Sequence, residues 1–183
     1  GTVRGATWTT AGRYGNALHF DGKNDYVDAA RLDVPGHAIT ISAWFKADSF
    51  PAGHDARILS KATGEAEQDH HIMLSLYAGY RQALRLRLKT NGTTKTLIAP
   101  EGPITTGVWV HAVATYDGKT ARLYKDGVEV GSMPLSGTLE VDSKVPTFIG
   151  ANPKGAGNNF HGTIDQVRVY NRALSPQEIQ ALY

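Results

Sequence analysis

Short stretches in which apolar and polar residues alternate run along most of the chain, and each predicts a strand with one buried face. The clearest is residues 39–45, where isoleucine, alanine and phenylalanine occupy every second position. In residues 84–89 leucine alternates with arginine or lysine. Helical periodicity is confined to the C-terminus, where Ser175 and Glu178 form a capping box around Pro176. The pattern predicts an all-β protein with one short C-terminal helix.

Turn signals separate these stretches and indicate how the strands pair. Three dipeptides predict hairpins, and therefore antiparallel neighbours. They are Asn91-Gly92, Asp117-Gly118 and Asp126-Gly127. A chain of 183 residues with 20 glycines and 8 prolines suits one undivided domain, residues 1–183. It opens on glycine without a signal peptide, so we expect a module excised from a larger secreted protein.

Composition narrows the partners. The formal net charge is +2, and the chain has neither a long basic run nor an apolar stretch of bilayer length, so we expect no nucleic-acid or membrane binding. The absence of cysteine removes disulfides and thiolate metal sites, but it does not fix the compartment. Seven histidines lack metalloprotease spacing, and His70-His71 are expected in a surface loop.

A turn rich in side-chain oxygens joins two strand-like runs within residues 15–28. Asp21, Asn24 and Asp25 stand around a glycine-containing turn, and such oxygens suit a hard cation, above all Ca²⁺. An ordinary solvated turn explains the same residues equally well. This stretch alone leaves both interpretations open.

Asp165 is the second candidate for that ion. It is in phase with Val167 and Val169, so its carboxylate is expected to point inward, where an unpaired charge is costly. A cation shared with the Asp21 turn would satisfy it. An arginine or backbone N–H groups would also satisfy the carboxylate, as would water if Asp165 lies at a solvent-exposed strand end.

Sugar recognition requires an aromatic platform and planar polar groups, and several predicted loops combine them. The candidates are Tyr77, Tyr80, Arg81 and Gln82 at one tip, Asn152, Asn158, Asn159 and Phe160 in another loop, and His54 and Asp55 on a further rim. Arg85, Arg87 and Lys89 form a basic stripe that would suit uronic-acid or sulfated polymers. Plain connecting loops and a solvated sheet face are the simpler alternatives. Carboxylates at two-residue spacing in residues 65–69 lack the apolar support of a catalytic acid.

The chain resembles the concanavalin A-like lectin/glucanase superfamily, in its bacterial laminin-G-like, pentraxin-like branch. The motifs that carry the likeness lie in residues 15–27, 39–45, 109–118, 123–127 and 160–175. The resemblance implies a secreted jelly-roll sandwich of two antiparallel sheets. It also implies a structural Ca²⁺ between Asp21 and Asp165, with backbone carbonyls near Lys23 and His161.

These observations lead to a functional expectation. The chain is expected to be a non-catalytic carbohydrate-binding module of a secreted bacterial polysaccharide-active enzyme, stabilised by calcium. Its expected partners are a polysaccharide or oligosaccharide and a neighbouring domain of the parent protein. The first alternative is a structural or adhesive interaction domain, and the second is a glycoside-cleaving enzyme.

Overall fold

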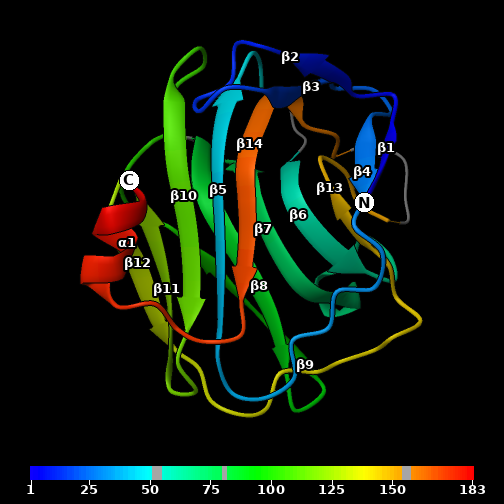
Figure 1. Cartoon of the computed structure of the whole chain (residues 1–183). Helices are drawn as coiled ribbons and strands as arrows, with labels where there is room; N and C mark the ends of the chain where they lie inside the picture. Colours follow the sequence, from blue (N-terminus) through cyan, green and yellow to red (C-terminus); the bar gives the residue numbers. More distant parts are fainter. Residues whose placement is uncertain (51–54, 80–81, 154–157) are drawn as a thin grey trace.

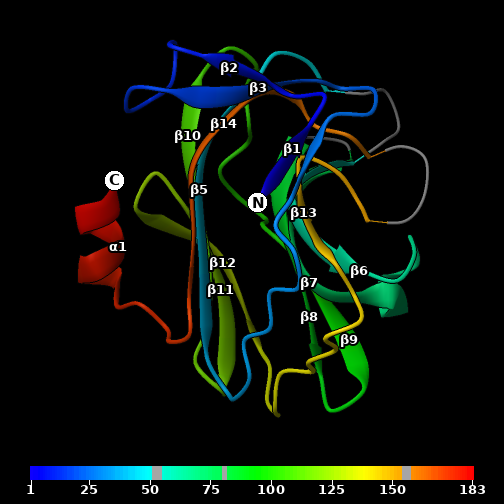
Figure 2. The ribbon, with the colours of Figure 1, turned by 45° about the vertical axis from the view of Figure 1, so that its right-hand side comes forward.

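Two seven-stranded sheets face each other and enclose the core of the molecule (Figures 1 and 2). The computed structural model describes residues 1–50, 55–79, 82–153 and 158–183. In spatial order, the first sheet consists of β1 (Thr2–Arg4), β4 (Tyr26–Asp28), β13 (Thr147–Ile149), β6 (Ala56–Ala62), β7 (His70–Ala78), β8 (Gln82–Thr90) and β9 (Thr93–Ile98). The second sheet consists of β12 (Val128–Pro134), β11 (Thr120–Lys125), β10 (Trp109–Tyr116), β5 (Ile39–Ala47), β14 (His161–Tyr170), β3 (Ala17–Asp21) and β2 (Thr7–Thr9).

The sheet pairings confirm the predicted all-β sandwich. Every pairing between the described strands is antiparallel, and tight turns join β8 to β9, β10 to β11 and β11 to β12 at the three predicted dipeptides. The apolar positions of residues 39–45 face the core, as do the leucines of residues 84–89. The alternation therefore predicted the inner faces of both sheets correctly. None of the helices among the described residues is long and apolar enough to cross a membrane.

The outer face of the first sheet is unusual because its side chains are buried as well. Met73 and Ser75 of β7 point away from the core, yet both are fully buried. Arg57 and Arg85 on the neighbouring strands are only 2% and 3% exposed. A basic stripe on a solvated face was the simpler expectation, and the burial of Arg85 contradicts it. This face consequently carries a polar layer outside the main core.

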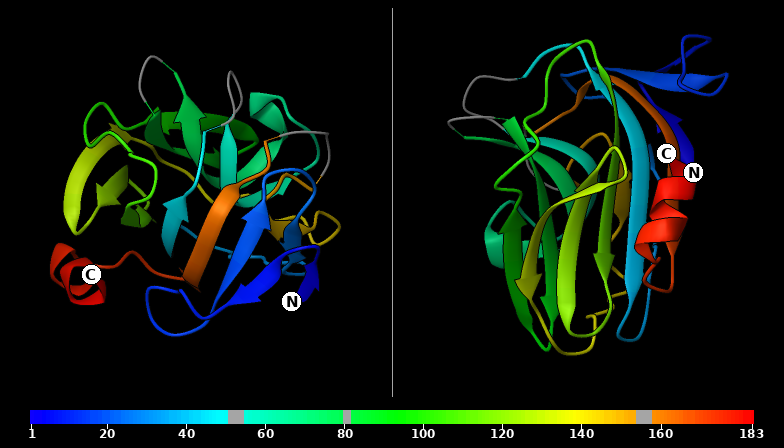
Figure 3. Two further views of the ribbon diagram at one scale, coloured as in Figure 1. Left: turned by 90° about the horizontal axis from the view of Figure 1, so that it is seen from above. Right: turned by 90° about the vertical axis from the view of Figure 1, so that its left-hand side faces the viewer.

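A short helix covers part of the outer face of the second sheet (Figure 3). Helix α1 (Pro176–Leu182) begins at Ser175, whose side chain accepts a hydrogen bond from the Glu178 N–H, as the sequence predicted. Ile179 is fully buried against β10 and β11. Beside it the ring of Tyr183 stacks on Trp44 at a centroid distance of 5.6 Å. The helix thus seals this end of the sheet.

Two local features differ from the sequence prediction. His70 and His71 begin β7 and are buried, because this strand starts two residues earlier than the apolar pattern indicated. A β-bulge lies between Asp165 and Arg168, where Gln166 has a φ of 49°. The extra residue changes the alternation of β14, so Asp165 and the following valines do not share one face.

Candidate functional site

Three arginines, from the two strands on either side of β7, gather on the outer face of the first sheet. Arg57 of β6 and Arg85 of β8 both pair with Ser75 of β7, so the three residues form one row across the sheet. Arg87 stands one row further along β8. We call Arg57, Arg85, Arg87 and the adjoining Asp55 the arginine cluster. The cluster therefore contains Arg85 and Arg87 of the predicted basic stripe, together with Asp55, which was predicted on a separate loop.

Asp55 is the carboxylate around which the cluster is built. Its Oδ2 atom lies 2.5 Å from Arg85 Nη2 and 3.5 Å from Arg57 Nη1, while Oδ1 accepts a hydrogen bond from the Ala78 N–H at 3.0 Å. Burial acts to raise the pKa of the Asp55 carboxyl. The Ala78 N–H and the two guanidinium groups outweigh burial, and they hold this pKa below its usual value. Asp55 is therefore a charged partner for both arginines.

Positive charge nevertheless predominates in the cluster. Burial, followed by repulsion from Arg85, lowers the pKa of Arg57 to about 10. The buried Nε atom of Arg57 has no hydrogen-bond partner among the described residues. A buried guanidinium nitrogen without a partner costs free energy unless water or a bound group satisfies it. Among the described residues, the cluster therefore leaves one buried guanidinium nitrogen without an acceptor.

Arg87 and His70 extend the cluster toward the start of β7. Arg87 Nε donates to Thr96 Oγ1 at 3.2 Å, and Arg87 Nη1 lies 3.2 Å from His70 Nδ1. Burial, the largest cause, and the neighbouring arginines lower the pKa of His70 to about 4, so His70 is neutral near pH 7. Its buried Nε2 atom also lacks a partner among the described residues. Glu67 binds the Thr96 hydroxyl at the rim, at 2.5 Å.

The predicted tip at the end of β7 contributes one described residue to this face. The guanidinium of Arg85 lies over the Tyr77 ring, 5.5 Å from its centroid. Gln82 follows the alternation of the leucines in β8, so it belongs to the opposite face. His54, Tyr80 and Arg81 lie outside the described residues. Tyr77 is thus the aromatic candidate that the structure places at the cluster.

The four sugar-binding candidates in the loop that ends at Phe160 make different structural contacts. The Asn158 carbonyl accepts a hydrogen bond from the Arg57 N–H at 3.0 Å, and Asn152 Oδ1 accepts one from Ser60 Oγ at 2.7 Å, so both residues flank the cluster. Asn159 instead donates to the Lys23 carbonyl. Phe160 is fully buried and packs edge-on against other core aromatics, so its assignment as a sugar platform was wrong.

Sequence patterns did not indicate that Arg57 belongs to the cluster or that His70 lies beside it. Arg57 stands beside a bulge in β6, which breaks the two-residue alternation that would have placed it on the outer face. His70 was assigned to a loop because no apolar residue precedes it on the strand. Only the pairing of β6, β7 and β8 brings these residues together, and no local pattern encodes that pairing.

The predicted cation turn is closed by hydrogen bonds of its own. Asp25 is buried and its Oδ2 atom accepts from the Asp21 N–H at 2.9 Å. Asp21 Oδ1 accepts from the Lys23 N–H at 2.8 Å, and this hydrogen bond is the largest cause of the lowered pKa of Asp21. Asn24 is exposed. These contacts are those of a well-formed turn.

Asp165 does not join that turn. It pairs with Trp44, whose side chain is on the outer face of the second sheet, so the predicted inward orientation was wrong because of the bulge. Its two oxygens accept from the Tyr14 N–H at 2.9 Å and the Gln166 N–H at 2.7 Å. Backbone N–H groups, one of the alternatives considered, therefore satisfy this carboxylate.

A calcium ion shared by the two motifs does not fit this arrangement. Asp21 pairs with His161, four residues before Asp165 on β14 and about 13 Å away at strand spacing. The oxygens of Asp21 and Asp165 already accept backbone hydrogen bonds at their separate places. Calcium requires six to eight converging oxygens. The Asp21 turn on its own remains a predicted calcium site.

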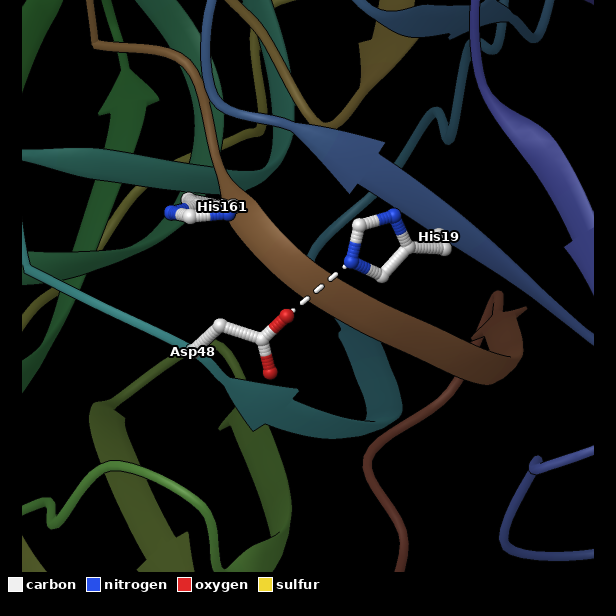
Figure 4. A group of neighbouring side chains, drawn as sticks. All are labelled: His19, Asp48 and His161. Atoms are coloured by element: carbon white, nitrogen blue, oxygen red, sulfur yellow. Dashed lines mark hydrogen bonds and ion pairs between the residues drawn. The ribbon is translucent and has the colours of Figure 1, made fainter.

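His161 belongs to a different group, which sequence analysis did not predict. It lies beside His19 and Asp48 on the second sheet (Figure 4). The sequence separates the three residues widely, so only the sheet register reveals the group.

The family of the chain follows from a comparison with known proteins. A family model described as the concanavalin A-like lectin/glucanases superfamily matches residues 21–180. The chain belongs to this superfamily. This match confirms the resemblance seen in the sequence, and the paired antiparallel sheets are consistent with it.

Proteins similar to this chain in sequence or fold occur in different settings. The chain is 25% identical over 175 residues to pappalysin-1 of Mus musculus, covering 89% of this chain and 11% of that protein. It spans only a small part of the curated relatives that it matches. Domain 4 of the extracellular arabinanase AbnA from Geobacillus stearothermophilus, solved with arabinotriose, has a TM-score of 0.73 at 21% identity, with 100% of this chain and 81% of that chain covered.

A second solved structure is also similar across nearly the whole fold. The CBM40 of the Ruminococcus gnavus IT-sialidase, bound to α2,3-sialyllactose, has a TM-score of 0.69 at 17% identity. The match covers 91% of this chain and 95% of that chain. At these identities the similarity demonstrates a shared fold.

Proposed function

We propose that the chain is a non-catalytic carbohydrate-binding module that binds an acidic glycan at the arginine cluster. The single observation that carries this proposal is the gathering of three arginines beside one aspartate, with Arg87 partly exposed to solvent. A carboxylate or sulfate of a sugar would accept from such guanidinium groups with short, charge-assisted hydrogen bonds. Glycan ligands in the similar arabinanase domain and CBM40 support a carbohydrate as the class of partner.

The surroundings of the cluster suit a sugar ring. Tyr77 is partly exposed and supplies an aromatic face next to Arg85, which allows contact with the apolar face of a pyranose. Arg87 is also partly exposed, so a ligand can reach it. The partly buried Asp55 holds Arg85 in place, because one of its oxygens binds that guanidinium and the other accepts a hydrogen bond from the Ala78 N–H. We expect Arg87 and Tyr77 to contact the glycan directly.

The two alternative functions, an interaction domain and a glycosidase, have less support from the residues on this face. An interaction domain would be favoured by a large apolar patch here, whereas the described residues of the cluster are charged or polar. A glycosidase would require a pair of free carboxylates. Glu67 is bound to Thr96, and Asp69 accepts from the Ala66 N–H at 3.0 Å. We further propose that the module acts outside the cell, attached to a glycan-active enzyme.

Affinity gels test the proposal directly. We expect retention on polygalacturonate, alginate or chondroitin sulfate that weakens as salt increases, because screening reduces attraction between charges. Arg87→Gln and Tyr77→Ala should each reduce retention at least tenfold. Arg168→Gln is the matched control, because Arg168 is an exposed arginine on the second sheet that contacts Gln166.

The possible outcomes test the class of sugar and the location of the binding site independently. Retention on neutral arabinan alone would contradict the acidic ligand. Equal retention of Arg87→Gln and the unchanged chain would contradict the cluster as the binding site. No retention on any acidic or neutral polysaccharide would overturn carbohydrate binding altogether.

A further inference from the structure

Two histidines and one aspartate come together on the outer face of the second sheet, on the other sheet from the arginine cluster (Figure 4). His19 comes from β3, His161 begins β14, and Asp48 directly follows β5. One nitrogen or oxygen atom of each lies within 4.8 Å of the other two. We propose that these residues, the His–Asp–His site, bind a divalent transition-metal ion of the zinc class.

The sheet register fixes the relative positions of the three ligands. His19 pairs with Thr163, and His161 stands two residues before Thr163 on the same strand. Residues at this spacing share a face, so both imidazoles point to the same side of the sheet. The Asp48 N–H donates to the His161 carbonyl at 3.0 Å, which ties the third ligand to the same place. Three hydrogen-bonded strands therefore preorganise the site.

The distances suit tetrahedral coordination after small side-chain rotations. Zinc binds histidine nitrogen and carboxylate oxygen at about 2.0–2.2 Å, so neighbouring ligand atoms lie about 3.3 Å apart. His19 Nε2 and Asp48 Oδ2 are 3.0 Å apart. The His19 and His161 rings are not stacked but meet at an interplanar angle of 79°. The ligand atoms of the three residues lie within 4.8 Å of one another, so side-chain rotation must bring them closer before one ion can bind all three.

The His161 ring is held from two sides. Ser49 Oγ lies 2.7 Å from His161 Nδ1, so an Nδ1–H can donate to the hydroxyl and leave the Nε2 lone pair for the metal. Gly22, at a φ of 77°, packs on the same residue, and a Cβ there would lie 2.8 Å from the His161 Cβ. Metal-binding histidines are commonly oriented by such a hydrogen bond. Ser49 is thus a positioning residue for the site.

The types of ligand atom in the His–Asp–His site indicate which class of metal ion it would bind. Two imidazoles and one carboxylate favour zinc and related ions over calcium, which prefers oxygen alone. Lys46 is on the neighbouring strand opposite Thr163, but its ammonium lies over the Trp109 ring, 5.6 Å from the centroid. The side chains of His19 and Asp48 are 37% and 38% exposed, so an ion can enter from solvent. Three protein ligands leave one position open for water or another donor.

Calorimetric titration of the tag-free chain with zinc chloride tests this proposal. We expect one equivalent to bind and to raise the melting temperature, since the ion binds the folded state selectively. His19→Ala and Asp48→Asn should each weaken binding at least tenfold, and Ser49→Ala should weaken it about tenfold through ring orientation. His37→Ala is the control, because His37 is exposed and contacts the Gly137 carbonyl elsewhere. It should leave zinc binding unchanged.

A spectroscopic readout identifies the ligands themselves. Long-range proton–nitrogen NMR spectra should show that zinc shifts the ring nitrogens of His19 and His161 and leaves those of His37 unchanged. Variants are first compared without metal, where melting temperatures close to that of the unchanged chain are expected for these partly exposed positions. The proposal is overturned if the unchanged chain binds no zinc, or if His19→Ala and Asp48→Asn bind it equally well.

Discussion

Asp55 and Arg85 form the closest ion pair of the arginine cluster, with Oδ2 and Nη2 at 2.5 Å. The Arg85 side chain is 4% exposed and that of Asp55 is 21% exposed, so the pair is largely withdrawn from water. Removing one partner of such a pair leaves a buried charge without compensation. Asp55 is therefore important for stability as well as for the orientation of the cluster.

Asp55→Asn is expected to destabilise the fold by about 2–3 kcal/mol at pH 7, because the charges of Arg57 and Arg85 lose their compensation. The pKa of Asp55 is lower in the folded state, so this contribution is present above the unfolded pKa of about 4 and is lost as the pH falls below it. Urea unfolding at pH 7 and pH 3 measures both effects. The difference between variant and unchanged chain should shrink at pH 3.

Arg122→Gln provides the control for this prediction. Arg122 pairs with Asp117 at 2.6 Å, but both side chains are about one-third exposed. Solvent screening limits such surface pairs to about 0–1 kcal/mol. If Arg122→Gln cost as much as Asp55→Asn, burial of the Asp55 pair would not explain its effect.

Buried histidines should make the fold sensitive to mild acid. Burial, the largest cause, lowers the pKa of His111 to about 4, and its ring stacks on Trp44 at 5.0 Å. The unfolded chain takes up this proton near pH 6.5, so stability falls as the pH decreases from about 6.5 to 4. We expect a loss of roughly 1–3 kcal/mol from His111, with a similar loss from His70.

Urea unfolding between pH 7 and pH 4 measures this loss. His111→Gln should reduce the pH slope while lowering stability at pH 7, because Ser42 loses its 2.9 Å contact with the ring and the stacking disappears. His37→Ala is the control for substituting an exposed histidine. An unchanged slope in His111→Gln would contradict the assignment.

The sequence predicted the sheets well because their information is local. Alternation marked the inner face of residues 39–45, and Asn91-Gly92 marked a hairpin, since each depends on neighbouring residues alone. The same alternation gave a wrong prediction for Asp165. One extra residue at Gln166 places the Asp165 side chain on the outer face of the sheet and not on the inner face. A bulge of this kind leaves no clear pattern of apolar residues.

The candidate sites depended on pairing between distant segments. Arg85 and Arg87 could be identified as a basic stripe, but Arg57 joins them only because β6, β7 and β8 are neighbours. His19 and Asp48 offered no signal at all, since their ion-binding geometry arises from three strands far apart in sequence. The chemistry of single residues was predictable, and their combination was not.

Ile179→Ala tests whether the helix and the arginine cluster are independent. Ile179 is fully buried in a small cluster with Val113 and Tyr124, separate from the main core. Truncating it should cost about 2–4 kcal/mol and expose Trp44, which lies beneath Tyr183. A red shift of tryptophan fluorescence and a lower melting temperature measure this. Glycan retention at a temperature below unfolding should not change, and its loss would show coupling between the two sheets.

Calcium binding is best tested by comparing the two aspartates that the sequence placed at one ion. The prediction from sequence is that millimolar calcium raises the melting temperature and that a chelator reverses this increase. The structure separates the residues, so a site confined to the Asp21 turn would lose the increase in Asp21→Asn and keep it in Asp165→Asn. Asp165→Asn should lower stability with or without calcium, by about 1–3 kcal/mol, because two N–H groups share its carboxylate. If both variants lost the increase in melting temperature, one calcium ion bound by Asp21 and Asp165 together would again be the better hypothesis. If calcium did not change the melting temperature of the unchanged chain, the predicted calcium site at the Asp21 turn would be wrong.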